Sequence, residues 1–291
     1  MRLGTRGSAL ALAQARWVAD RLDGAAELVP ITTLGDRGLD RLDKSRWVSE
    51  LEHALLDGRI DVAVHSAKDV PTELAAGLEL VAIPAREDAR DALCGARSVA
   101  ALAPGARVGT SSVRRAAQLR ATRDDIDVVD LSGNVDTRLR KLAEGQVDAL
   151  VLALAGLERL GRSGEAGGVI DEFIPAAGQG ALALEARAGE LDRAALAAVT
   201  DETAMACVGA ERALVAALGA SCHTPVGAHA QRLADGRLRL AGWVGLPDGS
   251  AWLRDEVTGA AGAVGAECAR RMLAAGARAL LERAEAEPAA S

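Results

Sequence analysis

The order of apolar and polar positions predicts short buried strands that alternate with amphipathic helices over the first part of the chain. In residues 8–22 the apolar side chains of Leu10, Trp17 and Val18 recur at helical spacing, and Ser8 is a suitable N-cap. The short apolar runs around this helix are typical of strands that are buried on both faces. The predicted elements are strands at 2–5, 27–32, 60–64 and 78–83 and helices at 8–22 and 47–56.

A second round of the same alternation begins near Asp91. Strand–helix–strand order of this kind indicates a largely parallel sheet with helices on both faces. From Pro175 onward a glycine-containing segment leads into another apolar strand, which we expect to return to the first sheet, so that two lobes are joined by two crossovers. The predicted elements of this round are strands at 107–109, 128–131 and 149–153 and helices at 112–122 and 135–144.

The pattern changes after about Asp201 and predicts a small α+β domain at the carboxyl end. A helix at 203–218 is followed by a polar loop at 219–225, by strands at 226–233, 238–244 and 252–257, and by one long final helix at 262–284. The predicted domains are residues 1–88 with the return segment 182–200, residues 89–181, and residues 201–291.

Length and composition are those of a multidomain globular protein. The 291 residues are too many for one core, and 49% of them are hydrophobic and 26% charged. The formal net charge is −7 and no basic cluster occurs, which argues against nucleic acid as a partner. Apolar stretches such as 149–157 are too short to cross a bilayer, and no apolar signal core follows Met1. We therefore expect no membrane association and a cytoplasmic location.

No pattern of cysteines or histidines predicts a metal site. Cys94, Cys207 and Cys268 are far apart in the sequence and are interpreted as small buried thiols. The four histidines have no ligand spacing with one another or with the cysteines. Positive charge rests on arginine, because 34 basic residues include only three lysines and therefore 31 arginines. The lysines are Lys44, Lys68 and Lys141.

Three predicted helix starts combine arginine with free backbone N–H groups. The clearest is Gly109-Thr110-Ser111-Ser112-Val113-Arg114-Arg115, where hydroxyls and two guanidiniums meet the first turn of a helix. The others contain Ser132 with Arg138, and Arg6 with Ser8. Such sites bind carboxylate or phosphate, and an N-cap with solvated arginines is the alternative. Three of them in an acidic protein predict a ligand with several negative groups, and no phosphate-loop or dinucleotide motif supports phosphate.

A predicted buried strand ends in a polar cluster within residues 61–71. It delivers His65, Ser66, Lys68 and Asp69 to the carboxyl edge of the sheet, where catalytic groups collect. An aspartate near cations stays ionised at neutral pH and can stabilise a developing positive charge. A surface ion pair at a helix start is the alternative interpretation.

Cys222 lies in a tight polar loop, Gly219-Ala220-Ser221-Cys222-His223-Thr224-Pro225, between a predicted helix and a predicted strand. A neighbouring imidazole favours the thiolate, and buried core cysteines seldom lie between serine and histidine in a Gly/Pro loop. We predict that Cys222 is reactive or modified, and that His223 is a hydrogen-bonding loop residue rather than a base.

These segments, in this order, resemble the porphobilinogen deaminase family. The resemblance covers nearly the whole chain, and the ordered set is specific although no single motif would suffice. The matching runs are 4–12, 64–71, 86–91, 109–115, 133–138, 155–161, 177–181 and 222–227.

The resemblance implies an α/β fold with two periplasmic-binding-protein-like lobes of mixed, mainly parallel sheets and a small α+β C-terminal domain. It implies a monomeric, cytoplasmic transferase that joins four porphobilinogen molecules head to tail and releases ammonia at each step. The product is hydroxymethylbilane, a precursor in tetrapyrrole and haem biosynthesis. The primer is a dipyrromethane cofactor, which the resemblance places on Cys222 as a covalent thioether.

The same resemblance assigns roles by matching motif positions. Asp69 and Lys68 would be catalytic, with Asp69 stabilising the cation left by loss of ammonia and handling protons. Each pyrrole unit carries acetate and propionate, which suits the arginine-rich helix starts. The residues implied for cofactor binding are Lys44, Lys68, Asp69, Thr110, Ser111, Ser112, Arg114, Arg115, Ser132, Arg138 and Cys222, and those implied for substrate binding are Arg6, Ser8, Arg138 and Arg159.

Two departures from the family pattern bear on rate rather than on fold. The loop between Asp36 and Lys44 is shorter than usual, and Ser132 stands where the family has an arginine. Arg140 and Arg162 are the candidates to replace that guanidinium. Two other functions stay open: an impaired paralogue that binds tetrapyrrole precursors, and a non-catalytic solute-binding module on the same fold.

Overall fold

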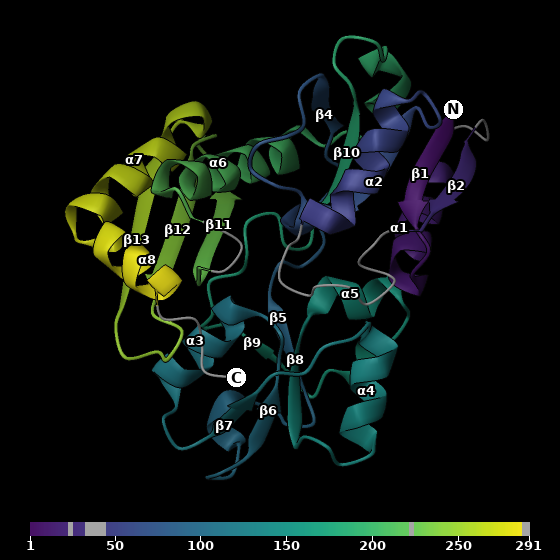
Figure 1. Ribbon diagram of the computed structural model, residues 1–291. Coiled ribbons are helices and arrows are strands. Elements are labelled where there is room, and N and C mark those ends of the chain that lie inside the picture. Colours follow the sequence, from purple (N-terminus) through teal and green to yellow (C-terminus); the bar gives the residue numbers. More distant parts are fainter. Residues whose placement is uncertain (23–25, 33–44, 221–223, 287–291) are drawn as a thin grey trace.

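The computed structural model describes residues 1–22, 26–32, 45–220 and 224–286. In this part of the chain the strands form three sheets, which define two lobes and a smaller C-terminal domain (Figure 1). None of the described helices is long and apolar enough to cross a membrane. The exact division points near residues 88, 181 and 200 remain a prediction.

Lobe 1 is built around a five-stranded mixed sheet. β1 pairs in parallel with β2 and β3, whereas β10 lies antiparallel between β3 and β4. The strand after the glycine-containing segment therefore returns to the first sheet, as predicted. In sheet order the strands are β2 (Glu27–Ile31), β1 (Arg2–Arg6), β3 (Val62–Ser66), β10 (Leu182–Arg187) and β4 (Leu78–Ala82).

Neighbouring residues of a strand point to opposite sides of the sheet, and in this sheet both sides carry apolar side chains. Helices therefore cover both faces. Val62 and Val64 of β3 pack in one core with Val18 of α1 (Ala9–Ala19) and with Leu196 of the 3-10 helix η5 (Arg193–Val199). Ala63, between them, packs in a second core with Leu51 and Leu55 of α2 (Ser45–Leu56). The helix α1 begins at Ser8, whose side chain accepts a hydrogen bond from the backbone N–H of Ala11.

Lobe 2 repeats this arrangement with a second mixed sheet. β6 pairs in parallel with β7 and β8, and β5 lies antiparallel between β8 and β9. Parallel and antiparallel pairs are thus equally frequent among the described strands of each lobe. In sheet order the strands are β7 (Asp127–Val129), β6 (Arg107–Gly109), β8 (Ala149–Ala153), β5 (Asp91–Cys94) and β9 (Gly168–Ile170).

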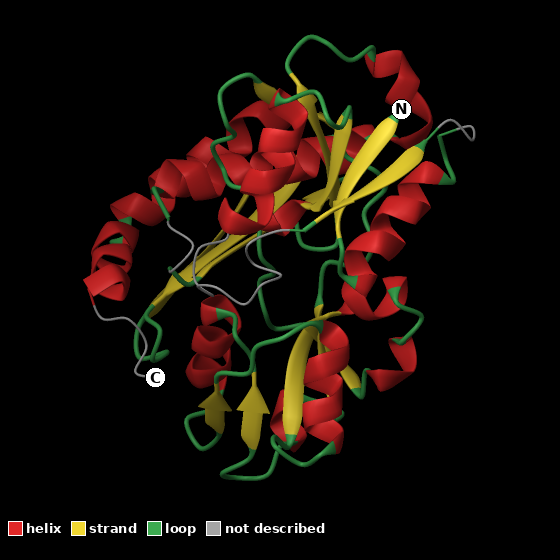
Figure 2. Cartoon of the chain, turned by 45° about the vertical axis from the view of Figure 1, so that its right-hand side comes forward, coloured by secondary structure: helices red, strands yellow, loops and turns green. Residues whose placement is uncertain are grey.

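The helices of lobe 2 again cover both faces of the sheet, as Figure 2 shows for the lower part of the molecule. Leu119 packs in the core that contains Val108 and Val151, whereas Leu139 packs in the core that contains Leu150 and Leu152. Leu119 belongs to α3 and Leu139 to α4, so these two helices lie on opposite faces. The helical segments are α3 (Val113–Thr122), α4 (Val135–Ala143), α5 (Leu154–Arg159), η3 (Val99–Ala101) and η4 (Ser163–Glu165).

In its described residues, 201–220 and 224–286, the C-terminal domain consists of an antiparallel sheet and three helices. The single final helix predicted at 262–284 is wrong, because the chain forms two helices, α7 and α8, that are separated at Gly276. The φ angle of +104° at Gly276 is incompatible with a continuous helix. In chain order the elements are α6 (Glu202–Leu218), β11 (Val226–Arg232), β12 (Leu238–Gly245), β13 (Trp252–Gly259), α7 (Ala261–Ala274) and α8 (Ala277–Ala286).

Two crossovers join the lobes, one between β4 and β5 and the other between β9 and β10, and they are bonded to each other. The backbone N–H of Glu87 in the first crossover donates to the carbonyl of Gly180 in the second, at 3.1 Å. Gly180 has a φ of +84°, and a Cβ placed there would lie 2.5 Å from the carbonyl oxygen of Glu87. Glycine at this position therefore permits both the backbone turn and the close approach of the crossovers.

Candidate active site

The predicted site residues lie at the carboxyl ends of strands in both lobes. In lobe 1, β1 ends at Arg6 and β3 ends at Ser66, directly before Lys68 and Asp69. In lobe 2, the helices α3 and α4 begin a few residues after β6 and β7 end, and α5 begins directly after β8. Burial lowers the pKa of Arg138 of α4, and the negative charges of Asp130 and Asp69 offset this effect only in part. The turn with Lys68 and Asp69 in lobe 1 is therefore close enough to Arg138 in lobe 2 for the charges of Asp69 and Arg138 to interact.

The turn that carries Lys68 and Asp69 is a single 3-10 turn, η2 (Ala67–Asp69). Ala67 is buried, and its backbone N–H donates to the carbonyl of Ala181 in the second crossover at 3.0 Å. Gly178 of that crossover has a φ of +72°, and a Cβ there would lie 2.9 Å from the carbonyl carbon of Ala67 and 3.0 Å from the nitrogen of Lys68. The second crossover thus packs directly against the turn, while the side chains of Lys68 and Asp69 remain half-buried.

The first turn of α3 is arranged by its own hydroxyl groups. Ser112 is the N-cap, and its side chain accepts a hydrogen bond from the backbone N–H of Arg115. The buried Thr110 hydroxyl oxygen accepts from the backbone N–H of Ser112 at 3.2 Å. These contacts fix the backbone at the helix start, as expected for a segment that must present donors to an anion.

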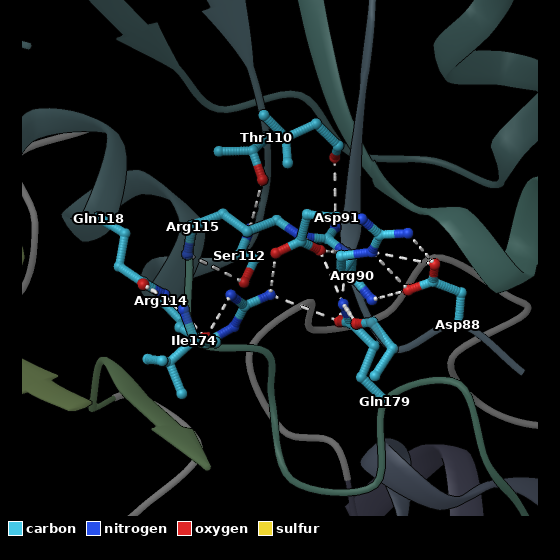
Figure 3. A network of polar contacts seen from close by, with 12 residues as sticks. Asp88, Arg90, Asp91, Thr110, Ser112, Arg114, Arg115, Gln118, Ile174 and Gln179 are labelled. Atoms are coloured by element: carbon cyan, nitrogen blue, oxygen red, sulfur yellow. Dashed lines mark hydrogen bonds and ion pairs between the residues drawn. The ribbon is translucent and has the colours of Figure 1, made fainter. Parts of the chain in front are cut away.

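Arg114 and Arg115 form a buried cluster with one carboxylate (Figure 3). Their guanidiniums lie 2.8 Å from the two oxygens of Asp91, and Arg114 and Arg115 are 4% and 5% exposed. The alternative of two solvated arginines is therefore wrong. Burial alone would raise the pKa of Asp91, but the charges of Arg114 and Arg115 lower it to about 2. With Asp91 ionised, two cations and one anion leave the cluster with a net charge of +1.

Gln179 completes this cluster, and Figure 3 shows it beneath Asp91. Its side-chain amide donates to Asp91 at 2.8 Å and to the carbonyl of Ala89 at 2.6 Å, while its oxygen accepts from both arginines at 3.4 Å. No pattern in the sequence indicates a role for Asp91 or Gln179 in the site. Asp91 lies in the run 86–91 and Gln179 in the run 177–181. They are 88 residues apart in the sequence, so their contact could not be predicted from spacing.

Arg138 and Arg159 are cations whose described partners are neutral. Arg138 donates to the carbonyl of Gly133 at 2.7 Å and to the hydroxyl of Ser111 at 3.0 Å. Burial, reinforced by the charge of Arg115, lowers the pKa of Arg138 to about 10. Arg159 donates to the carbonyl of Gly180 at 2.7 Å, and burial lowers its pKa as well. Within the described chain neither forms an ion pair, so an anionic ligand would supply the missing counter-charge.

Neither candidate replacement for the family arginine is available beside Ser132. Arg140 pairs with Glu144 at 2.6 Å, and Arg162 pairs with Asp136 at 2.5 Å and with Glu165 at 2.9 Å. Instead Lys141 contacts this residue, with its Nζ donating to the backbone carbonyl of Ser132 at 3.4 Å. The side chain of Ser132 is half-buried.

Two further predicted substrate-binding residues, Arg6 and Ser8, lie at the end of β1 and directly before α1. Arg6 is half-buried at the end of β1, and Ser8 serves as the N-cap of α1. Lys44 and Cys222 lie outside the described residues. The other three cysteines are buried, which confirms that they are core thiols. Burial raises the pKa of Cys94 and of Cys268 to about 11, so these thiols are poor nucleophiles at neutral pH.

Two family models match the chain. The model for "Porphobilinogen deaminase, dipyromethane cofactor binding domain" matches residues 1–195, and the model for "Porphobilinogen deaminase, C-terminal domain" matches residues 205–274. The chain belongs to the porphobilinogen deaminase family. Members of this family are transferases of tetrapyrrole biosynthesis that use a dipyrromethane cofactor, so the family assigns this cofactor to the chain.

Curated porphobilinogen deaminases match over nearly their whole length. The chain is 48% identical to that of Deinococcus deserti, covering 97% of this chain and 98% of that protein. It is 48% identical to that of Thiobacillus denitrificans and 46% identical to that of Thermus thermophilus, with 96% of this chain and 97% of each relative covered. These relatives support an enzyme of this family rather than a non-catalytic binding module or an impaired paralogue.

A solved structure, the VFT2 domain of BvgS from Bordetella pertussis, matches at 17% sequence identity with a TM-score of 0.38, and it covers 67% of this chain and 82% of that domain. A similarity this low supports no statement about ligand or function.

Proposed function

We propose that this chain is a cytoplasmic, monomeric hydroxymethylbilane synthase in which Asp69 is the catalytic carboxylate and Cys222 carries the dipyrromethane. The observation that carries this proposal is the buried cluster of Arg114 and Arg115 with Asp91 at the start of α3, together with Arg138, on which the charge of Asp69 in lobe 1 acts. The site thus combines the half-buried carboxylate of Asp69 with several guanidiniums. That combination suits a reaction that turns over polycarboxylates through a cationic intermediate.

The described residues fit a dipyrromethane. Such a group carries acetate and propionate side chains, and Arg138 and Arg159 offer guanidiniums without a described counter-ion. The cluster of Asp91, Arg114 and Arg115 adds a net charge of +1. Buried within it, Arg114 Nε has no hydrogen-bond partner among the described residues. These donors would hold the carboxylates by charge-assisted hydrogen bonds.

When bound, the dipyrromethane supplies the free pyrrole position to which the first porphobilinogen is joined. Arg138, Ser111 and the first turn of α3 would orient its carboxylates from lobe 2. Arg6, at the end of β1, would hold a carboxylate of the incoming porphobilinogen from lobe 1, and Arg159 would do so from α5. Lys44 would approach from the segment before α2, and Ser132 and Ser8 would contribute neutral hydrogen bonds.

Asp69 would act on the substrate in two ways. Loss of ammonia from porphobilinogen leaves a positively charged carbon, and a fixed carboxylate nearby lowers the energy of that charge. The same carboxylate would deliver a proton to the leaving amine and accept one from the pyrrole after the new bond forms. Lys68, its neighbour in the 3-10 turn, would hold a ligand carboxylate close to this centre.

The covalent cofactor gives the first test of the proposal. The intact mass of the purified protein should exceed the sequence mass by one dipyrromethane, and peptide mapping should place the addition on Cys222. Cys222→Ala should lack both the addition and the activity, whereas Cys94→Ala should keep the addition. A protein without the addition, or with it on Cys94, Cys207 or Cys268, would show that the assignment to Cys222 is wrong.

The charge of Asp69 gives the second test. Asp69→Asn keeps the shape and removes the charge, so we expect a loss in kcat of at least about 30-fold, corresponding to 2 kcal/mol or more. Asp57→Asn, which changes a carboxylate that pairs with Arg59 on the surface, should keep wild-type kcat. Near wild-type turnover in Asp69→Asn would contradict the catalytic assignment. Analytical ultracentrifugation would test the monomer.

A further inference from the structure

The helix α6 extends from the C-terminal domain to lobe 1, as Figure 1 shows. Its first turns pack against the catalytic turn, because Ala204 and Val208 lie in one core with Ala67 and Val70. Arg212 follows Val208 by four residues, so it lies on the same face of the helix. The side chain of Arg212 therefore projects along the surface that contacts the turn.

Arg212 donates to three consecutive backbone carbonyls directly after Asp69. Its guanidinium lies 3.1 Å from the oxygen of Val70, 2.6 Å from that of Pro71 and 3.1 Å from that of Thr72. No described backbone N–H group donates to these three oxygens. The segment forms neither helix nor strand, and among the described residues Arg212 is the donor to all three carbonyls.

Partial burial of the Arg212 guanidinium removes water from a charged group and destabilises its charged form. Burial lowers the pKa of Arg212, and the charge of Glu185 only partly offsets this effect. Among the described residues Arg212 makes no ion pair, so its charge is directed entirely at the carbonyl dipoles. Charge-assisted hydrogen bonds of this kind are about twice as strong as neutral ones and fix a segment firmly.

We propose that Arg212 is a positioning residue that holds the catalytic turn, and with it Asp69, against the C-terminal domain. This inference rests on the proposed catalytic role of Asp69. The second crossover supports the turn on the side of Ala67, through the carbonyl of Ala181. Arg212 supports the other end, so the two contacts bracket Asp69 and restrict its movement relative to the substrate.

The neighbouring residue on α6 makes contacts of a different kind. Glu211 is fully buried, pairs with Arg86 of the first crossover at 2.5 Å and accepts from the backbone N–H of Gly178 in the second at 2.7 Å. Glu211 therefore holds the crossovers, whereas Arg212 holds the catalytic turn. Loss of Arg212 should leave the connection between the lobes intact and disturb mainly the segment around Asp69.

The test compares Arg212→Met, which keeps the apolar stem and removes the donors, with Arg212→Lys and with the control Arg271→Met. Arg271 pairs with Asp255 within the C-terminal domain, so its loss removes a guanidinium far from the turn. We expect Arg212→Met to lower kcat roughly 10- to 100-fold, the scale of a 1 Å misplacement, with KM within about twofold. Arg212→Lys should recover part of kcat, and Arg271→Met should resemble wild type.

Two further measurements separate positioning from misfolding. Intact mass should show the dipyrromethane on Arg212→Met at the wild-type level, and hydrogen exchange should become faster in the peptide that spans residues 66–74 but not in β12. Unchanged exchange in 66–74, or a kcat within twofold of wild type, would overturn the proposal. If Arg212→Met does not fold, Arg212→Lys decides: faster exchange in 66–74 with lower kcat supports the proposal, and wild-type values overturn it.

Failure of the catalytic assignment would look different. If Asp69→Asn kept wild-type turnover while Arg212→Met still accelerated exchange in residues 66–74, Arg212 would hold the turn but Asp69 would not be the catalytic group. The two proposals therefore fail on separate observations.

Discussion

The arginines of the candidate site form two groups, those paired with a carboxylate and those bonded only to neutral oxygens among the described residues. Arg114 and Arg115 share the carboxylate of Asp91, whereas Arg138 and Arg159 donate to neutral oxygens. A buried cation without a counter-ion destabilises the folded state, and such groups concentrate where a ligand supplies the opposite charge. Arg138 and Arg159 are therefore better candidates than Arg114 and Arg115 for direct contact with the carboxylates of a ligand.

The buried cluster predicts a specific pH dependence of stability. The pKa of Asp91 is lower in the folded chain, about 2, than the usual 3.8, so the unfolded chain binds its proton first as the pH falls. The stability from Asp91 is present above about pH 4 and is lost as the pH falls toward 2, an effect of about 2 kcal/mol. In urea unfolding, wild type should exceed Asp91→Asn in stability near neutral pH, and the difference should shrink over this range.

A stability difference that stayed constant from about pH 6 to pH 2 would contradict this prediction. If Asp91→Asn does not accumulate as a folded protein, the carboxyl carbon shift of Asp91 provides a direct titration in the wild-type chain. A midpoint near 3.8 would then show that the guanidiniums do not hold the charge.

The sequence identified the arginines of the site but not all of their partners. Arg114 and Arg115 stand out because they open a predicted helix after a strand. Their contact with Gln179 depends on how the second crossover passes beneath Asp91. Residues so far apart in the sequence produce no periodicity or spacing from which the contact could be predicted. A reactive or modified Cys222 is predicted from its polar loop, whereas the cofactor on Cys222 and the role of Lys44 rest on the family resemblance, and all of these remain predictions.

At the level of helices and strands, apolar patterning located most elements to within a few residues. The strands β6 and β8 were predicted with the bounds that the structure has. The short strands β5 and β9 were not predicted separately, because neither is followed by an amphipathic helix pattern, whereas the equally short β6 precedes the helix α3. The final helix was predicted as one because its apolar pattern continues through Gly276, and an isolated glycine does not by itself end a helix.

The start of α4 gives a prediction about the residue at position 132. Asn134 caps this helix by accepting from the backbone N–H of Thr137 at 2.8 Å, and Lys141 reaches the carbonyl of Ser132. A new arginine at 132 would lie near two cations, Lys141 and Arg138, the second of which donates to the carbonyl of Gly133. We therefore expect Ser132→Arg to raise kcat/KM no more than a few-fold. The exposed control Ser163→Arg should change nothing. A gain of a hundredfold or more would mark the chain as an impaired paralogue.

At the level of the whole molecule, the crossovers connect the lobes, and the second crossover also supports the turn that carries Asp69. Gly178 and Gly189 allow this role to be tested, because both have a φ of +72° but only Gly178 is crowded. Alanine at either position should cost about 1 kcal/mol of backbone strain. Only Gly178→Ala should also lower kcat, since its Cβ would press on Ala67 and Lys68. Equal kcat in the two variants would show that the crossover does not control the turn.

The return of β10 to lobe 1 has a consequence for how the chain is made. On a ribosome, β4 has no neighbouring strand to pair with until β10 emerges, because among the described strands it pairs with β10 alone. The strands of lobe 2 all lie between Asp91 and Ile170, so that lobe can close its sheet while lobe 1 is still incomplete. Because folding units form as their segments leave the ribosome, we expect the inserted lobe to mature before the lobe that begins the nascent chain.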